Sequence, residues 1–182
     1  SSFKPFIYYS FLRKEFPMNV IIENSPLKFG DWKPKNYSGK FSGNLTVLEG
    51  LEDSVNIVAI KLLRRVVIKN AIDTARKAGI VSDIPYNLTT ALGTLSLSPF
   101  ELAKAYIPFS NGGYSVEPIF ITKIEDRYGK TIYEAEQKKE EVFDKETIAL
   151  LVHMMENVVK NGSGKKAYAG VQQAGKTGTT ND

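Results

Sequence analysis

The chain has 182 residues, of which 42% are hydrophobic and 24% charged, enough apolar material for one or two globular units with a sizeable core. No uninterrupted apolar run approaches the length of a membrane span, and no charged-then-apolar signal segment opens the sequence. The absence of cysteine excludes thiol catalysis, cysteine-ligated metals and disulfides, and a net charge of +4 suits an anionic setting or a plain basic surface.

The first residues of the chain combine a hydroxyl and an amine at helical spacing. Ser1 and Lys4 share one face of a predicted helix, and a lysine can take a serine's proton once burial or a nearby cation makes its neutral form accessible. This Ser–Lys pair is a minimal acyl-transfer device. The same spacing recurs at residues 25–28 and 163–166, but proline and glycine place those matches in loops. The predicted helix is indicated by a set of apolar positions, Phe3, Phe6, Ile7, Phe11 and Leu12.

Residues 17–45 are predicted to form a long irregular segment after the first helix ends near Phe16 and Pro17. The segment mixes proline and glycine with aromatic residues. Loops of this length often form the rim of a functional site. The alternative is a surface loop without such a function, held in place by its aromatic side chains.

Two helices are predicted to follow. A capping box at Thr46–Glu49 starts the first, which runs to about Glu52. Residues 53–56 open the second helix. Ser54 and Asn56 therefore lie at a helix junction, where short polar side chains can point into a cleft. The alternative is that Ser54 only caps the helix. The core-facing positions of the second helix are Ile57, Ile60, Leu63 and Val67. Residues 70–77 continue helical and stop at Gly79.

The second half of the chain alternates helix, hairpin and helix. A second capping box at Ser98–Glu101 starts a helix that ends at residues 111–113, and a β-hairpin follows between residues 116 and 133. Residues 134–145 are predicted to be a solvated, charge-rich connection. Asp144 then caps a helix that closes at residues 161–162.

Several kinds of chemistry lack support in the sequence. His153, the only histidine, falls on the exposed side of the last helix, which leaves no histidine for a Ser-His-Asp triad. The sequence has no HExxH, Walker A or GxGxxG string. We therefore expect no metal and no cofactor.

The segment Lys176-Thr177-Gly178-Thr179 near the end of the chain is the most specific motif. On a strand, a glycine between threonines lets a ligand backbone approach closely, while the hydroxyls and the lysine meet a carboxylate. A threonine-rich strand with a glycine bulge is the plain alternative.

Over nearly its full length the chain resembles the active-site-serine penicillin-binding transpeptidases, and among them the class A bifunctional group. The three motifs S-x-x-K, S-x-N and K-T-G occur in the order typical of that superfamily. The resemblance is carried by the strings SFKPF, LTVLEGLEDSVNIVAIKL, LSLSPFELAKAYIPFSNGG and GKTGTTND. It implies an α+β fold of the penicillin-binding transpeptidase and serine β-lactamase type, mainly its helical part with few strands.

The resemblance also implies a role for each motif residue. Ser1 would be the nucleophile, Lys4 the base that activates it, Ser54 a proton relay toward the leaving amine, and Asn56 a holder of the substrate amide and the lysine. The terminal carboxylate of a D-alanyl-D-alanine stem peptide, or of a β-lactam, would be bound by a second set, Lys176, Thr177, Gly178 and Thr179.

The backbone N–H groups of Thr179 and Ser1 would form the oxyanion hole. The expected reaction is peptidoglycan crosslinking through a serine acyl-enzyme, outside the cytoplasm, in a longer membrane-anchored protein. Its partners would be stem peptides and β-lactam antibiotics, with no nucleic acid. A DD-carboxypeptidase or β-lactamase-like hydrolase, and a non-catalytic β-lactam sensor or scaffold, are the alternatives.

The resemblance makes residues 1–182 a partial transpeptidase domain that starts at the serine and ends just after the K-T-G motif. The glycosyltransferase domain and the flanking sheet strands would lie elsewhere. Without those strands, the apolar faces of the first helix and of the hairpin would be left uncovered.

Overall fold

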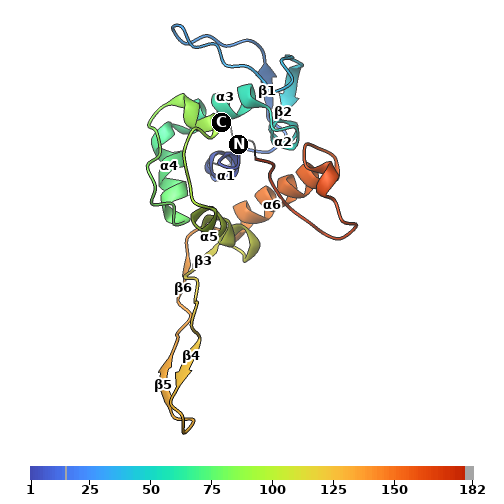
Figure 1. Ribbon diagram of the computed structural model, residues 1–182. Coiled ribbons are helices and arrows are strands. Elements are labelled where there is room, and N and C mark those ends of the chain that lie inside the picture. Colours follow the sequence, from blue (N-terminus) through green and yellow to red (C-terminus); the bar gives the residue numbers. More distant parts are fainter. Residues whose placement is uncertain (15, 179–182) are drawn as a thin grey trace.

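The computed structural model describes residues 1–14 and 16–178, and it gathers the helices around α1, with a β-ribbon projecting from them (Figure 1). Both helices and strands are present, with helices forming the body. No helix in the described part of the chain is long and apolar enough to cross a membrane. The elements are α1 Lys4–Leu12, β1 Ile21–Asn24, β2 Gly43–Thr46, α2 Val47–Glu52, α3 Asn56–Val66, α4 Ile68–Lys77, α5 Pro99–Ser110, β3 Tyr114–Val116, β4 Lys123–Glu125, β5 Thr131–Glu134, β6 Lys139–Glu141 and α6 Lys145–Lys160, with 3-10 turns at Leu88–Leu92 and Lys165–Ala167.

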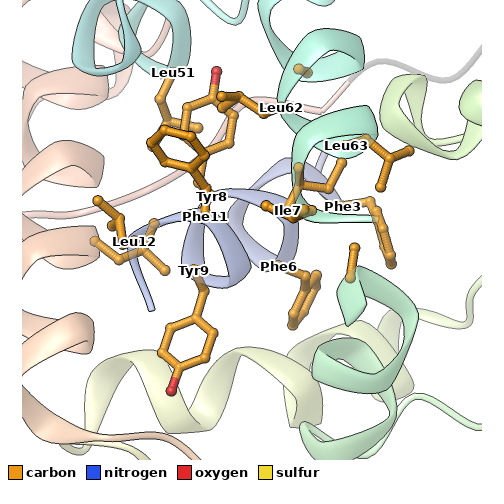
Figure 2. Close-up of a cluster of buried hydrophobic side chains, with 14 of the residues drawn as sticks. Phe3, Phe6, Ile7, Tyr8, Tyr9, Phe11, Leu12, Leu51, Leu62 and Leu63 are labelled. Atoms are coloured by element: carbon orange, nitrogen blue, oxygen red, sulfur yellow. The ribbon is translucent and has the colours of Figure 1, made fainter. Parts of the chain in front are cut away.

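Helix α1 is the centre of the core. All nine of its residues are buried, and it packs against α3, α4 and α6. Figure 2 shows its large side chains pointing in several directions, with Leu62 and Leu63 of α3 on one side. The expectation that an apolar face of this helix would be left uncovered is therefore wrong, because helices of the chain itself surround it.

The helix boundaries around the S-x-N motif follow the predicted caps. Thr46 Oγ1 accepts a hydrogen bond from the Glu49 N–H at 3.1 Å and Glu49 Oε2 accepts one from the Thr46 N–H at 2.7 Å, which confirms the capping box of α2. Helix α3 begins at Asn56 as predicted. Val67, predicted to face the core, is instead exposed and takes a φ of 72° between α3 and α4.

The segment predicted to be irregular contains a strand pair. Strand β1 pairs antiparallel with β2, and Ile21 lies opposite Thr46 while Asn24 lies opposite Gly43. The partners are far apart in sequence, so neither a hairpin turn nor a local pattern announces the pairing. Residues 25–42 between the strands form an irregular loop.

The hairpin of β4 and β5 is confirmed, and its strands are exposed along their whole length. The following connection is more ordered than predicted, because β6 pairs antiparallel with β3 and lengthens the ribbon. Its charged side chains gave no strand signal. Asp144 caps α6 as predicted, with its carboxylate accepting from the Thr147 N–H at 2.8 Å.

The second predicted capping box is only half formed. Ser98 Oγ accepts from the Glu101 N–H at 3.1 Å, as expected for the N-cap of α5. The Glu101 carboxylate does not reach back, because it accepts hydrogen bonds from the N–H groups of Val81 and Ser82.

Candidate active site

The three sequence motifs meet at one cavity of about 490 Å³. Its wall includes Ser1 from the segment before α1, Ser54 from the turn between α2 and α3, Asn56 from the start of α3, and Thr177 from the last described segment. Lys35, Tyr37, Asp53, Leu92 and Ser163 complete the lining. A separate cavity of about 560 Å³ lies between α1 and α4 and contains none of the motif residues.

The hydroxyl of Ser54 lies between the other groups of the site. Its oxygen is 3.0 Å from Ser1 Oγ, 3.1 Å from Lys4 Nζ and 2.8 Å from Lys176 Nζ. The sequence pairs Ser1 directly with Lys4 through helical spacing. In the structure the two side chains make no hydrogen bond with each other, and Ser54 connects them.

Lys4 is wholly buried and held by three acceptors. Its Nζ donates to Ser54 O at 2.6 Å, to Ser54 Oγ at 3.1 Å and to Asn56 Oδ1 at 2.9 Å. Burial, and then the nearby cation of Lys176, lower the pKa of Lys4 to about 7. A large fraction of Lys4 is therefore neutral near neutral pH, the form in which it can accept a proton.

Ser54 has an unusual backbone conformation. Its φ is 56°, in the left-handed region that costs energy for a residue with a side chain. The turn that imposes it is closed by the Ser54 N–H donating to Leu51 O at 3.0 Å and the Val55 N–H donating to Gly50 O at 2.9 Å. This conformation allows both the carbonyl and the hydroxyl of Ser54 to meet Lys4.

Thr177 lines the cavity, and the neighbouring Lys176 reaches Ser54 from the same segment. Lys176 Nζ donates to Thr177 Oγ1 at 2.9 Å and to Thr177 O at 3.2 Å, and Thr177 Oγ1 lies 3.0 Å from Ser163 Oγ. Burial lowers the pKa of Lys176 to about 8. The hydroxyl of Thr177 and the ammonium of Lys176 are hydrogen-bond donors suited to binding a carboxylate.

The strand predicted at the K-T-G motif is not formed in the described residues. Lys176, Thr177 and the exposed Gly178 lie outside any strand, because no described strand runs beside them to complete a ladder. The segment is instead attached to α6, where the Gly175 N–H donates to Met155 O at 3.2 Å. Thr179 lies outside the described residues.

Gly93 is a site neighbour that the sequence did not single out. Its φ is +81°, and a Cβ on it would lie 2.3 Å from the backbone nitrogen of Ser1. That nitrogen donates to Leu92 O at 3.2 Å.

The two other Ser-x-x-Lys matches are not equivalent to the first. Ser25 lies away from the cavity, where its hydroxyl accepts a 3.4 Å contact from Lys61 Nζ. Ser163 does line the cavity, but Lys166, its partner in spacing, is exposed. Among the described residues no cluster of three or more carboxylate or histidine side chains is arranged to hold a metal ion.

The fold and site define a penicillin-binding transpeptidase domain. The protein-family model described as the penicillin binding protein transpeptidase domain matches residues 1–182, and the chain belongs to this family. This confirms the resemblance found in the sequence. The α+β fold is confirmed as well, since a solved structure of penicillin-binding protein 1A from Haemophilus influenzae superposes with a TM-score of 0.92 at 27% identity. That match covers 100% of this chain and 34% of the other.

The chain is also similar in sequence to penicillin-binding proteins 1A from several bacteria. The protein from Pseudomonas aeruginosa is 31% identical over 241 residues, covering 100% of this chain and 29% of the relative. The protein from Aquifex aeolicus is 37% identical over 189 residues, covering 100% of this chain and 26% of the relative. The chain thus spans less than a third of the length of these relatives.

Proposed function

We propose that this chain is the catalytic part of a peptidoglycan DD-transpeptidase that crosslinks stem peptides through an acyl-enzyme on Ser1. The observation that carries the proposal is the hydroxyl of Ser54, which is hydrogen-bonded to Ser1, Lys4 and Lys176 at once. This network gives a serine nucleophile a proton path to a buried amine whose pKa is about 7.

In the acylation step Ser1 Oγ attacks the carbonyl carbon of the bond between the two terminal D-alanines. The Ser1 proton passes to Ser54 Oγ, and the Ser54 proton passes to the neutral amine of Lys4. The carbon–nitrogen bond then breaks, and the protons return along the network to the nitrogen of the departing D-alanine. The result is an ester on Ser1 and neutral Lys4. A β-lactam follows the same course, but its leaving nitrogen stays attached.

The second step transfers the acyl group to an amine. The acceptor amine attacks the ester carbonyl, its proton is taken through Ser54 to Lys4, and Ser1 Oγ leaves and recovers a proton. Hydrolysis would need a base for water, and Asp53 is the only carboxylate among the described residues that line the cavity. Asp53 is exposed and makes no hydrogen bond to Ser1 or Lys4. The relay through Ser54 to Lys4 would serve water as well as an amine, so amine transfer over a carboxypeptidase or β-lactamase-like reaction is supported by the match to the transpeptidase family.

We assign substrate binding to the segment of Lys176 and Thr177. Lys176 and the hydroxyl of Thr177 would hold the terminal carboxylate, and the family motif extends this role to Gly178 and Thr179. The backbone N–H groups of Thr179 and Ser1 would stabilise the oxyanion. We place the reaction outside the cytoplasm, in a membrane-anchored protein of which this chain is a part.

The test is acylation followed by transfer in the intact protein. After treatment with benzylpenicillin, peptide mass spectrometry should find the adduct on Ser1. A stem-peptide donor with an added amine acceptor should then give the crosslinked product in excess over the hydrolysed one. An adduct on Ser25 or Ser163 would refute the site. Hydrolysis of the stem peptide at the same rate with and without the acceptor amine would favour a DD-carboxypeptidase. A penicillin adduct on a protein that does not turn over stem peptides would favour a non-catalytic β-lactam sensor.

A further inference from the structure

Helix α3, which carries the S-x-N asparagine, lacks a capping side chain of its own. Its N-cap residue is Val55, which has no acceptor to offer the free N–H groups of the first turn. The acceptor comes from the loop at residues 25–42. Asn36 Oδ1 accepts from the Ile57 N–H at 3.1 Å, 21 residues away in sequence.

The residue before Asn36 makes a second contact with the same turn. The backbone oxygen of Lys35 accepts from Asn56 Nδ2 at 2.9 Å. The amide of Asn56 is thereby oriented, since its other end, Oδ1, accepts from Lys4 Nζ at 2.9 Å. A rotated amide would place an NH₂ group against the Lys4 amine and lose both bonds. Two adjacent loop residues thus hold two adjacent residues of α3.

Asn36 is itself fixed from the other side. It is 8% exposed, and its Nδ2 donates to Asn24 Oδ1 at 2.8 Å and to Lys40 O at 2.8 Å. Asn24, at the end of β1, is 3% exposed and donates to Ser42 Oγ at 2.9 Å. A buried amide with all its donors and acceptors engaged resists reorientation. The strand pair β1–β2 therefore supports the loop where it touches α3.

We propose that Asn36 is a positioning residue for the acyl-transfer reaction, which acts through Asn56 to hold the amine of Lys4 against Ser54. Asn36 does not line the cavity and would not touch substrate. The inference rests on the proposed function, because it assigns Asn36 to the reaction of the same site. It explains why two buried asparagines, Asn24 at the end of β1 and Asn36 in the loop, lie outside the three motifs.

The test measures acylation by a fluorescent penicillin in the intact protein, resolved into the noncovalent dissociation constant and the acylation rate constant. Asn36→Ala should lower the rate constant about 10- to 100-fold, the scale for a misplaced catalytic group, with little change in the dissociation constant. The acid limb of the rate profile should move to lower pH, because the Lys4 ammonium loses a hydrogen-bond acceptor.

Matched variants separate positioning from lost stability. Asn36→Ala combined with Val55→Thr places a capping hydroxyl at the start of α3, and should recover melting temperature but not the rate constant. Ser98→Ala removes the cap of α5 at a residue that does not line the cavity, and should lower melting temperature with the rate constant and pH limb unchanged.

The inference would be overturned if the double variant recovered the acylation rate constant as well as the melting temperature. It would also be overturned if the acid limb of the rate profile of Asn36→Ala stayed at its original pH. These outcomes are distinct from a failure of the proposed function, in which the unaltered protein would not be acylated on Ser1.

Discussion

The hydroxyl oxygens of Ser1 and Ser54 lie 3.0 Å apart although 53 positions separate the two residues in the chain. The contact places the second serine between the first and both lysines of the site. A proton leaving Ser1 therefore has a continuous hydrogen-bonded route that passes through Ser54 before it reaches Lys4.

Two substitutions at Ser54 should separate its chemistry from its backbone strain. Ser54→Ala and Ser54→Gly both remove the relay and should slow acylation about 10²- to 10⁴-fold, the range for losing acid–base assistance. Their stabilities should differ, because glycine relieves the left-handed φ of 56° and alanine does not. Ser54→Gly should be about 1 kcal/mol more stable than Ser54→Ala in urea unfolding. Acylation of either variant at the original rate would refute the relay.

The rate of acylation should rise with pH through about 7, as Lys4 loses its proton and becomes a base. Lys176 lowers the pKa of Lys4, so removing its charge should raise that pKa. Lys176→Gln should therefore move the acid limb of the profile to higher pH. The midpoint is the relevant quantity, because the same change also weakens substrate binding. A midpoint that stays in place would mean that Lys4 is not the group titrating.

Gly93→Ala should impair acylation more than its effect on folding explains. The added Cβ would lie 2.3 Å from the nitrogen of Ser1, so the nucleophile must shift. Gly129→Ala is the matched control, since it has nearly the same φ, +82° against +81°, and no atom within 4 Å of the added Cβ. Alanine at a positive φ should lower the melting temperature of both variants by a similar amount, which thermal unfolding measures. Equal acylation rates in the two variants would show that Ser1 tolerates the displacement.

Thr177→Val should weaken recognition of the substrate carboxylate. The change keeps the shape of the side chain and removes a hydroxyl that is hydrogen-bonded to Lys176 Nζ and Ser163 Oγ. Binding of a penicillin should weaken by about 1.5 to 3 kcal/mol, the scale for a hydrogen bond to a charged group. An analogue with its carboxylate amidated should lose much less. Equal losses for both ligands would assign Thr177 a structural role alone.

Local signals in the sequence predicted the helices well. The caps at Thr46, Ser98 and Asp144 depend on residues three apart, so their side chains find their partners wherever the helix lies. The turn of the hairpin is local in the same way, with Asp126 Oδ1 accepting from the Tyr128 and Lys130 N–H groups.

Contacts between distant segments could not be predicted in this way. The pairings of β1 with β2 and of β3 with β6 join strands separated by long segments, and β6 is made of charged residues. In the site, the motif spacing brought Ser1 near Lys4 but did not predict that Ser54 would lie between them. Asn36 was missed because an isolated asparagine in a loop carries no pattern that reveals its partner in α3.

The complete enclosure of α1 has a consequence for how this site responds to heat and denaturant. A helix whose nine residues are all buried cannot fray or swing aside while its neighbours stay in place. Its amide hydrogens should exchange with solvent deuterium only when the surrounding helices open together. The nucleophile is attached to the start of this helix, so loss of acylation and loss of the core should occur in a single cooperative transition.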